Sequence, residues 1–220
     1  MNLVLYSGGF EKENISLDRK LLELADKENP SITYIPSCSY DSEIDFNDFI
    51  RHYRALGISR FIHFPVDIDF DETIKKEAFL SDIIHLSGGN TYYFLKHLRR
   101  KGMLKELKAF VKRGGVLTGL SAGAILMTPS ICTAGFPEFD KDENEDNIKN
   151  LKAMNLVRFE FFPHYRNSKR YDSELIKHSK GLDRPIYACP DGSGIIVKEG
   201  TLAFEGKCFS FFQGKKVKIN

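Results

Sequence analysis

The chain has 220 residues, 42% of them hydrophobic and 28% charged, so it is long enough to bury a sizeable core as a single domain over residues 1–220. Its 32 Lys and Arg nearly balance its 30 Asp and Glu, and a net charge of +2 gives no general attraction for nucleic acid or an anionic membrane. No run approaches the length of a membrane span and residues 1–7 lack the basic region and cleavage site of a signal peptide, so we expect a cytoplasmic protein. The cysteines lack metal-ligand and disulfide spacing, so we expect free thiols and no metal site; they are Cys38, Cys132, Cys189 and Cys208.

Apolar runs of strand length alternate with segments of helical period along the first part of the chain. The strands are expected at 2–6, 31–36, 60–65 and 83–86, with helices at 17–25, 44–56 and 74–80. The strands are almost continuously apolar, which is typical of parallel strands covered by helices on both faces. The sequence therefore predicts an α/β fold with a doubly wound, mostly parallel sheet. In such sheets ligands bind beyond the carboxyl ends of the strands.

Glycine pairs follow the first and fourth predicted strands. The first, Gly8-Gly9 after Ser7, lacks the spacing of a dinucleotide or phosphate loop, so we expect a packing role there. The second, Gly88-Gly89, stands before Asn90-Thr91 and a helical run over 92–99, and paired glycines let two backbone N–H groups face one small cavity. This segment is therefore a candidate for half of an oxyanion hole.

The segment Gly119-Leu120-Ser121-Ala122-Gly123 joins a short apolar run at 114–118 to a helical run at 124–127. It has the pattern of a nucleophile elbow, a sharp corner that holds its serine in a strained conformation. Gly119 and Gly123 would let the backbone pass closely on either side of Ser121. The alternative is a glycine-rich turn with a capping serine.

The second half of the chain is organised differently. A loop opens at 136–140 and continues through an acidic run at 141–147, and a strand is expected at 156–162. After a helix at 171–180, short runs separated by glycines predict antiparallel hairpins that close the sheet, at 186–188, 194–198, 201–204, 207–212 and 217–219.

A catalytic serine needs a histidine to take its proton and a carboxylate to orient that histidine. Of the 6 histidines, His164 is the one that directly follows a predicted strand downstream of Ser121. Among the carboxylates between the two, Glu138 ranks first because Pro137 and Phe139 favour its packing, and Asp140 ranks second.

Three segments together resemble the S51 serine peptidases, a family that includes aspartyl dipeptidases and cyanophycinases. They are Leu86 to Thr91, similar to the G-G-N-T segment of the family, Gly119 to Ala124, similar to its G-x-S-A-G-A elbow, and Pro163-His164. The resemblance implies a class I glutamine amidotransferase-like fold for one α/β peptidase domain with C-terminal β-hairpins. It implies Ser121 as nucleophile, His164 as general base and the backbone N–H groups of Gly89 and Ala122 as the oxyanion hole.

The resemblance also bears on the triad acid and on the substrate. The aspartate that some members place after the serine falls near Phe136 here, whereas other members use a glutamate slightly further on, which points to Glu138 and a Ser-His-Glu triad. The candidate substrate-binding residues are Asn90, in the G-G-N-T-like segment, and Arg166 and Arg170. The two arginines are candidates because an arginine beyond the histidine reads a substrate aspartate in part of the family. A guanidinium would suit a carboxylate, although either arginine could equally be a solvated residue at a helix start.

The expected activity is hydrolysis of a dipeptide or another small peptide, aspartyl peptides among the candidates, through an acyl-enzyme and without a cofactor. No nucleic acid or membrane partner is expected, and a homodimer is compatible with the sequence. Two alternatives stay open: a binding or regulatory module that has lost turnover, and an esterase of the α/β-hydrolase type. A glutamine amidotransferase is excluded because the elbow carries Ser121 in place of cysteine.

Overall fold

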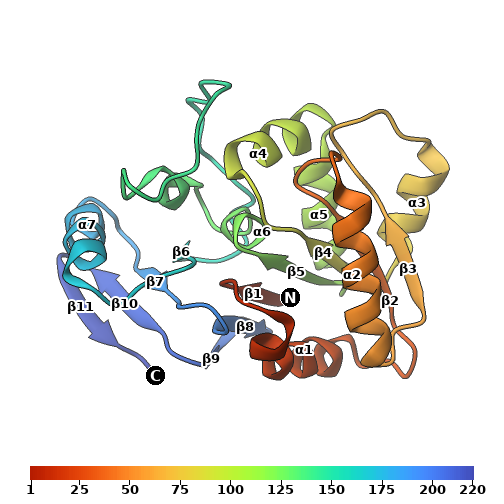
Figure 1. The fold of residues 1–220 in the computed structure, drawn as a ribbon, viewed down its shortest axis with the longest axis horizontal. Helices are drawn as coiled ribbons and strands as arrows, with labels where there is room; N and C mark the ends of the chain where they lie inside the picture. Colours follow the sequence, from red (N-terminus) through yellow and green to blue (C-terminus); the bar gives the residue numbers. More distant parts are fainter.

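The computed structural model describes residues 1–220, and a sheet of seven strands lies at its centre (Figure 1). The strands run in the order β3-β2-β4-β5-β1-β8-β9. Strands β1 to β5 are mutually parallel, whereas β8 and β9 form an antiparallel hairpin beside β1. Their bounds are β1 Asn2–Tyr6, β2 Ser31–Ile35, β3 Arg60–His63, β4 Ile83–Leu86, β5 Val116–Leu120, β8 Gly194–Lys198 and β9 Thr201–Glu205.

Helices cover both faces of this sheet, and each face has its own apolar core. Helices α1 (Glu11–Ala25) and α2 (Ser42–Ala55) pack on one face through residues such as Leu17, Leu21 and Tyr53. Helices α3 (Glu72–Leu80), α4 (Thr91–Arg100), α5 (Met103–Lys112) and α6 (Ala122–Ile125) cover the other face. The prediction of a doubly wound, mostly parallel sheet is confirmed.

A second sheet of four strands stands beside the first, in the order β11-β10-β7-β6. Strands β6 (Glu160–Phe162) and β7 (Ile186–Ala188) are parallel, while β10 (Phe209–Phe212) and β11 (Lys215–Lys218) form a hairpin. Helix α7 (Lys169–Ser179) packs on this sheet over a separate aromatic core that contains Tyr165 and Phe211, at the left of Figure 1. The predicted C-terminal hairpins are therefore present, but only β8–β9 extends the first sheet, and β10–β11 belongs to the second.

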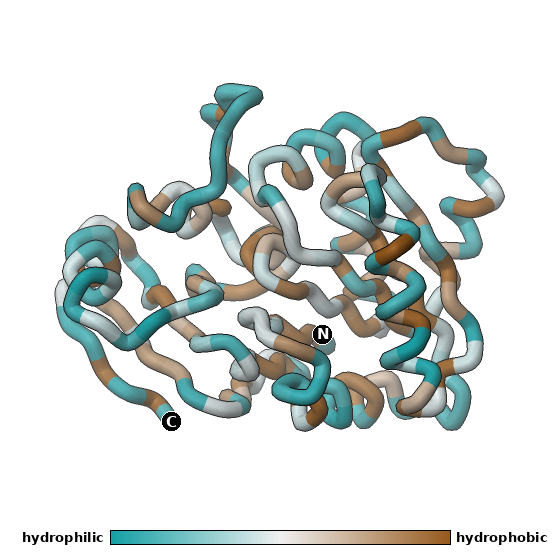
Figure 2. The backbone as a smooth tube through the Cα atoms, viewed as in Figure 1, coloured by the Kyte–Doolittle hydropathy of each residue, from teal (hydrophilic) through white to brown (hydrophobic).

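The long segment between α6 and β6 contains one short 3-10 turn, η1 (Cys132–Gly135), and otherwise irregular backbone. Residues 138–150 project from the body of the protein, and Figure 2 shows this projection mostly in the teal of hydrophilic residues. The strand expected at 156–162 is shorter, because only Glu160–Phe162 pair with β7. No helix of the chain has the length and apolar character needed to span a membrane.

Candidate active site

Ser121 occupies the corner between β5 and α6. Its backbone has φ 50° and ψ −109°, in the positive-φ region that side chains other than glycine rarely adopt. A Cβ atom at Gly119 would lie 2.4 Å from the carbonyl carbon of Gly123, and one at Gly123 would lie 2.2 Å from the oxygen of Leu86. Both glycines are therefore required by the close passage of the backbone, as the elbow pattern predicts.

His164 is brought to Ser121 from the second sheet. It follows β6 and Pro163, and its Nε2 lies 2.9 Å from Oγ of Ser121. The backbone at His164 also has a positive φ, of 53°, which turns the chain sharply after the strand. The predicted partnership of Ser121 and His164 is thus a direct hydrogen-bonding contact in the structure.

The second ring nitrogen of His164 faces Asp191. The distance from His164 Nδ1 to Oδ1 of Asp191 is 2.7 Å, and the two side chains are each about half exposed. An Nδ1–H that donates to a carboxylate fixes the tautomer in which Nε2 can accept the proton of the serine. Ser121, His164 and Asp191 therefore form a continuous hydrogen-bonded series with the geometry of a catalytic triad.

Ser7 and Gly8, at the end of β1, hold this series in place. The backbone N–H of His164 donates to Oγ of Ser7 at 2.8 Å, and that hydroxyl donates to the carbonyl oxygen of Cys189 at 2.6 Å. A Cβ atom at Gly8 would lie 2.2 Å from Cε1 of His164 and 2.4 Å from Oδ1 of Asp191. The packing role expected for Ser7, Gly8 and Gly9 is therefore fulfilled at Ser7 and Gly8, which contact His164, and Gly8 also lies against Asp191.

Glu138 does not reach His164, so the predicted Ser-His-Glu arrangement is wrong for this residue. Its side chain is 85% exposed and its carboxylate pairs with Lys141 at 2.7 Å. Phe136 and Pro137 are buried, whereas residues 138–140 are all exposed, so the chain leaves the core just before Glu138. Asp140, the second choice, accepts a hydrogen bond from the hydroxyl of Tyr171 at 2.5 Å and likewise makes no contact with His164.

Sequence reasoning missed Asp191 because the search was limited to carboxylates between Ser121 and His164. A signal was available at the strand ends. Strands β6 and β7 are parallel neighbours with Phe162 opposite Ala188, so the residues that follow them reach the same edge. His164 follows one strand and Asp191 the other, and the strand-end rule that selected the histidine would also have selected this aspartate.

The candidate oxyanion donors lie beside Ser121. The backbone N–H groups of Gly89 and Ala122 donate to no other group of the chain. Gly89 has φ +132°, and a Cβ atom there would lie 2.1 Å from Oγ of Ser37, so the loop needs glycine at this position. The loop is also fixed at Ser87, whose Oγ accepts from the N–H of Ser37 at 2.8 Å and whose carbonyl oxygen accepts from the N–H of Gly123 at 3.2 Å.

A cavity of about 860 Å³ opens over the serine and the histidine. Its apolar wall includes Phe136, Phe139 and Phe162, and its charged residues are Asp140, Lys141, Asp142, Arg166 and Asp191. Gly89 lies on its wall as well, so the candidate oxyanion loop faces the same space. The volume is in the range of pockets that bind small organic molecules. The cavity can therefore hold a small ligand against Ser121.

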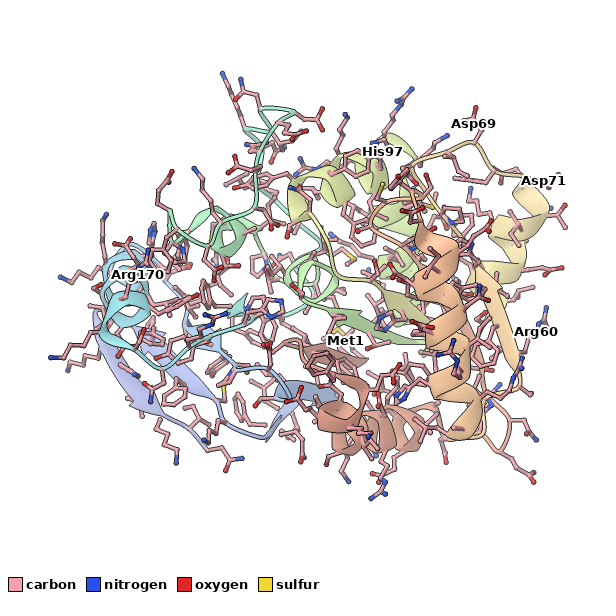
Figure 3. All side chains as sticks on the ribbon, in the orientation of Figure 1. Met1, Arg60, Asp69, Asp71, His97 and Arg170 are labelled. Carbon is pink, nitrogen blue, oxygen red and sulfur yellow. The ribbon has the colours of Figure 1, made fainter.

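The predicted substrate-binding residues have different surroundings. Arg166 is exposed, lines the cavity and forms no ion pair within the chain. Arg170 lies on α7, where Figure 3 labels it, and its guanidinium stacks 3.3 Å from the centre of the Phe139 ring. Asn90 caps α4, because its Oδ1 accepts from the N–H of Tyr93, and its amide donates to the carbonyl oxygen of Glu143. Only Arg166 of the three lines the cavity.

Comparisons with known proteins match this chain along most of its length. The model of peptidase family S51 matches residues 3–204. The uncharacterized peptidase Lmo0363 of Listeria monocytogenes is 28% identical over 173 residues, which are 76% of this chain and 82% of that protein. Peptidase E of Escherichia coli O139:H28 is 35% identical over 137 residues, which are 57% of this chain and 56% of that protein.

Solved structures share the fold. A Listeria monocytogenes EGD-e protein provisionally assigned as a peptidase E superposes with a TM-score of 0.75 at 24% identity, covering 93% of this chain and 97% of that one. A peptidase from an acI-B1 Actinobacterium superposes with a TM-score of 0.69 at 16% identity, covering 99% of this chain and 96% of that one. The fold is therefore class I glutamine amidotransferase-like, as expected.

Proposed function

Because the chain belongs to peptidase family S51, we propose that this peptidase is of the serine type and hydrolyses a dipeptide or another small peptide through Ser121, His164 and Asp191. The observation that carries the proposal is the position of the His164 ring, 2.9 Å from the serine hydroxyl and 2.7 Å from the aspartate. It supports general-base activation of a hydroxyl that is otherwise a poor nucleophile.

In the first step Oγ of Ser121 attacks the carbonyl carbon of the scissile peptide bond, and His164 Nε2 takes the hydroxyl proton. The imidazolium that forms is stabilised by the carboxylate of Asp191, which stays ionised. Charge collects on the former carbonyl oxygen, and the unpaired N–H groups of Gly89 and Ala122 are the donors that we assign to it.

Collapse of this tetrahedral intermediate breaks the C–N bond. His164 gives its proton to the leaving amine, and the acyl group remains as an ester on Ser121. A water molecule then enters where the amine left, His164 takes its proton, and attack on the ester carbon gives a second tetrahedral intermediate. Its collapse returns the proton to Oγ and releases the carboxylic acid, which restores the free enzyme.

For the substrate, we propose a small peptide with a carboxylate that Arg166 binds, an aspartyl peptide being one example. Among the cations on the cavity wall, Lys141 already pairs with Glu138, whereas Arg166 forms no ion pair. A guanidinium binds a carboxylate through two parallel charge-assisted hydrogen bonds. Arg170 is assigned an indirect role, because its stacking on Phe139 supports the apolar wall.

The proposal is tested by labelling with a fluorophosphonate, which modifies activated serines. The intact protein is expected to become labelled at Ser121, while Ser121→Ala and His164→Ala variants with unchanged thermal unfolding are not. Absence of labelling in the intact protein would contradict the serine-peptidase proposal and favour a binding module without turnover. Hydrolysis of p-nitrophenyl esters with no cleavage of a dipeptide library would instead favour an esterase.

A further inference from the structure

A second cavity, of about 370 Å³, lies on the other side of the catalytic loops. Gly88 and Leu120 line it, whereas their chain neighbours Gly89 and Ser121 line the active-site cavity. Its other walls come from α1, α2 and the ends of β1, β2 and β4. Nothing in the proposed hydrolysis uses this space.

The charge of the second cavity has one sign. Four carboxylates line it, from Glu11, Asp18, Asp45 and Asp48, and no lysine or arginine does. Asp48 pairs with Arg51 at 2.9 Å outside the cavity, but neither Glu11 nor Asp45 forms an ion pair within the chain. The rim of the cavity therefore keeps at least two uncompensated negative charges.

At its inner end Asp18 is almost completely buried, with 1% of its surface exposed. Its Oδ1 accepts hydrogen bonds from the hydroxyls of Tyr6 and Tyr53 at 2.9 and 2.8 Å, and its Oδ2 lies 2.8 Å from Nε2 of His52. When His52 is protonated this contact neutralises Asp18, and the charge of the cavity then rests on the rim. Burial of so polar a cluster in a core is costly, and its hydrogen bonds hold Asp18 in one orientation.

Two further side chains that line the cavity carry polar atoms without partners. Oδ1 of Asn14 and Nδ1 of His85 are enclosed and make no hydrogen bond within the chain, although both residues are more than nine-tenths buried. The amide group of Asn14 is oriented by donation to the carbonyl oxygen of Gly8 at 3.2 Å. Buried polar atoms are usually paired, so two unpaired ones beside one cavity are an uncommon feature that a bound ligand would explain.

Aromatic rings form the remaining wall. The ring of His85 stacks on Tyr34 with centroids 5.8 Å apart, and Phe49 lies 5.0 Å from His85 and 4.8 Å from Tyr34. Aromatic faces attract organic cations, and the attraction strengthens in a space that excludes water. An ammonium or guanidinium group on a short apolar stem suits this combination of groups. The combination consists of carboxylates at the rim, polar acceptor atoms further in and aromatic rings along the wall.

We propose that this cavity is a second ligand site, distinct from the active site, that binds a small organic cation of the alkylammonium or alkylguanidinium class. The cation enters between Glu11 and Asp45, donates hydrogen bonds to the acceptors of the walls and lays its stem against Tyr34 and Phe49. The same chemistry is offered by a free amine and by the side chain of a lysine or arginine residue.

Calorimetric titration with n-pentylguanidinium and n-pentylammonium tests the site, with n-pentanol and hexanoate as the neutral and anionic controls of similar size. Saturable binding of the cations, and of neither control, is expected at low ionic strength, and it weakens as salt is added. Equal binding of pentanol, or no binding of either cation, would overturn the proposal. Blocked arginine, as N-acetyl-arginine amide, distinguishes the sources: binding comparable to pentylguanidinium assigns the site to a peptide side chain, and much weaker binding assigns it to free amines.

The location is tested with the double variant Glu11→Gln/Asp45→Asn, whose side chains are both exposed, and thermal unfolding checks that the variant is folded. It is expected to weaken cation binding by about tenfold, as loss of two close charges predicts. The matched control is Glu43→Gln, an exposed carboxylate on α2 that does not line the cavity, and it should leave binding unchanged. If the double variant binds as the intact protein does, the cation lies elsewhere and the proposal fails.

Discussion

Nδ1 of His164 and Oδ1 of Asp191 are 2.7 Å apart, although the two residues are separated by α7 in the chain. The contact exists because β6 and β7 are parallel neighbours whose carboxyl ends share one edge. The carboxylate that contacts the histidine therefore follows the neighbouring strand and does not come from the loop that follows the serine.

Replacing Asp191 by Asn should lower kcat by a factor on the order of 10⁴, because an amide no longer favours the tautomer in which Nε2 accepts a proton. Steady-state kinetics on a cleaved peptide measures the loss. Glu138→Gln is the control, since it removes only an exposed ion pair with Lys141 and should leave kcat within about twofold. A large loss of kcat in Glu138→Gln and a small one in Asp191→Asn would instead identify Glu138 as the residue that orients His164.

Replacing Gly8 by Ala should abolish turnover while the protein stays folded. The new methyl group would overlap the ring of His164 and the carboxylate of Asp191, and the half-exposed histidine can yield by turning away from Ser121. Far-ultraviolet circular dichroism and the rate of fluorophosphonate labelling separate folding from activity. Gly181→Ala, where the nearest atom is 3.9 Å away, should change neither.

Replacing Ser7 by Ala should reduce both stability and kcat. The variant leaves the N–H of His164 without an acceptor, whereas the carbonyl oxygen of Cys189 keeps its hydrogen bond from the N–H of Tyr165. One unpaired buried group costs about 1–3 kcal/mol. Chemical denaturation measures the free energy of unfolding. A stable variant with normal kcat would show that Ser7 does not position the histidine.

Burial of His85 should make the protein less stable in mild acid. Desolvation lowers the pKa of this histidine to about 4, below its ordinary value of 6.5, so the unfolded chain binds its proton first as the pH falls. Above pH 6.5 the ring is neutral in both states and its titration does not affect the free energy of unfolding. As the pH falls from 6.5 toward 4, the free energy of unfolding decreases by roughly 3 kcal/mol. The neighbouring His52 acts in the opposite direction, since its hydrogen bond to Asp18 raises its pKa.

The variant His85→Phe isolates this contribution. Phenylalanine keeps the stack on Tyr34 and carries no titrating nitrogen, so the slope of unfolding free energy against pH between 6.5 and 4 should be smaller than in the intact protein. Urea denaturation at closely spaced pH values measures it. An unchanged slope would mean that other groups cause the acid sensitivity.

The first half of the fold could be predicted from sequence because its parallel strands are buried on both faces and appear as continuous apolar runs. Ile83 to Leu86 is the clearest case, and its predicted bounds match β4. The second sheet could not be foreseen, since its hairpin β10–β11 has the same local pattern as β8–β9, and only tertiary packing decides which sheet each hairpin joins.

The elbow and His164 could be predicted from the sequence because each has a local sequence feature. Close passage of the backbone requires glycines, and the end of a strand is marked by a proline. Gly119 and Gly123 mark the corner, and Pro163-His164 marks the end of a strand. Asp191 was missed because only carboxylates between Ser121 and His164 were considered. The strand-end signal marks Asp191 too, but the pairing of β6 with β7 that brings it to His164 is not visible in sequence order. Glu138 had the right chemistry and a packed-looking neighbourhood, but the loop places its carboxylate in solvent.

The proposed nucleophile and its proposed base are carried by different sheets, Ser121 by the seven-stranded one and His164 by the four-stranded one. Ser7 connects them, through the hydrogen bonds that join β1 to His164 and Cys189. Ser121 precedes residues 160–191 in the chain, so it is synthesised first. A nascent or truncated chain that ends before His164 therefore carries Ser121 without its imidazole partner, and we expect fluorophosphonate labelling of Ser121 to require both sheets.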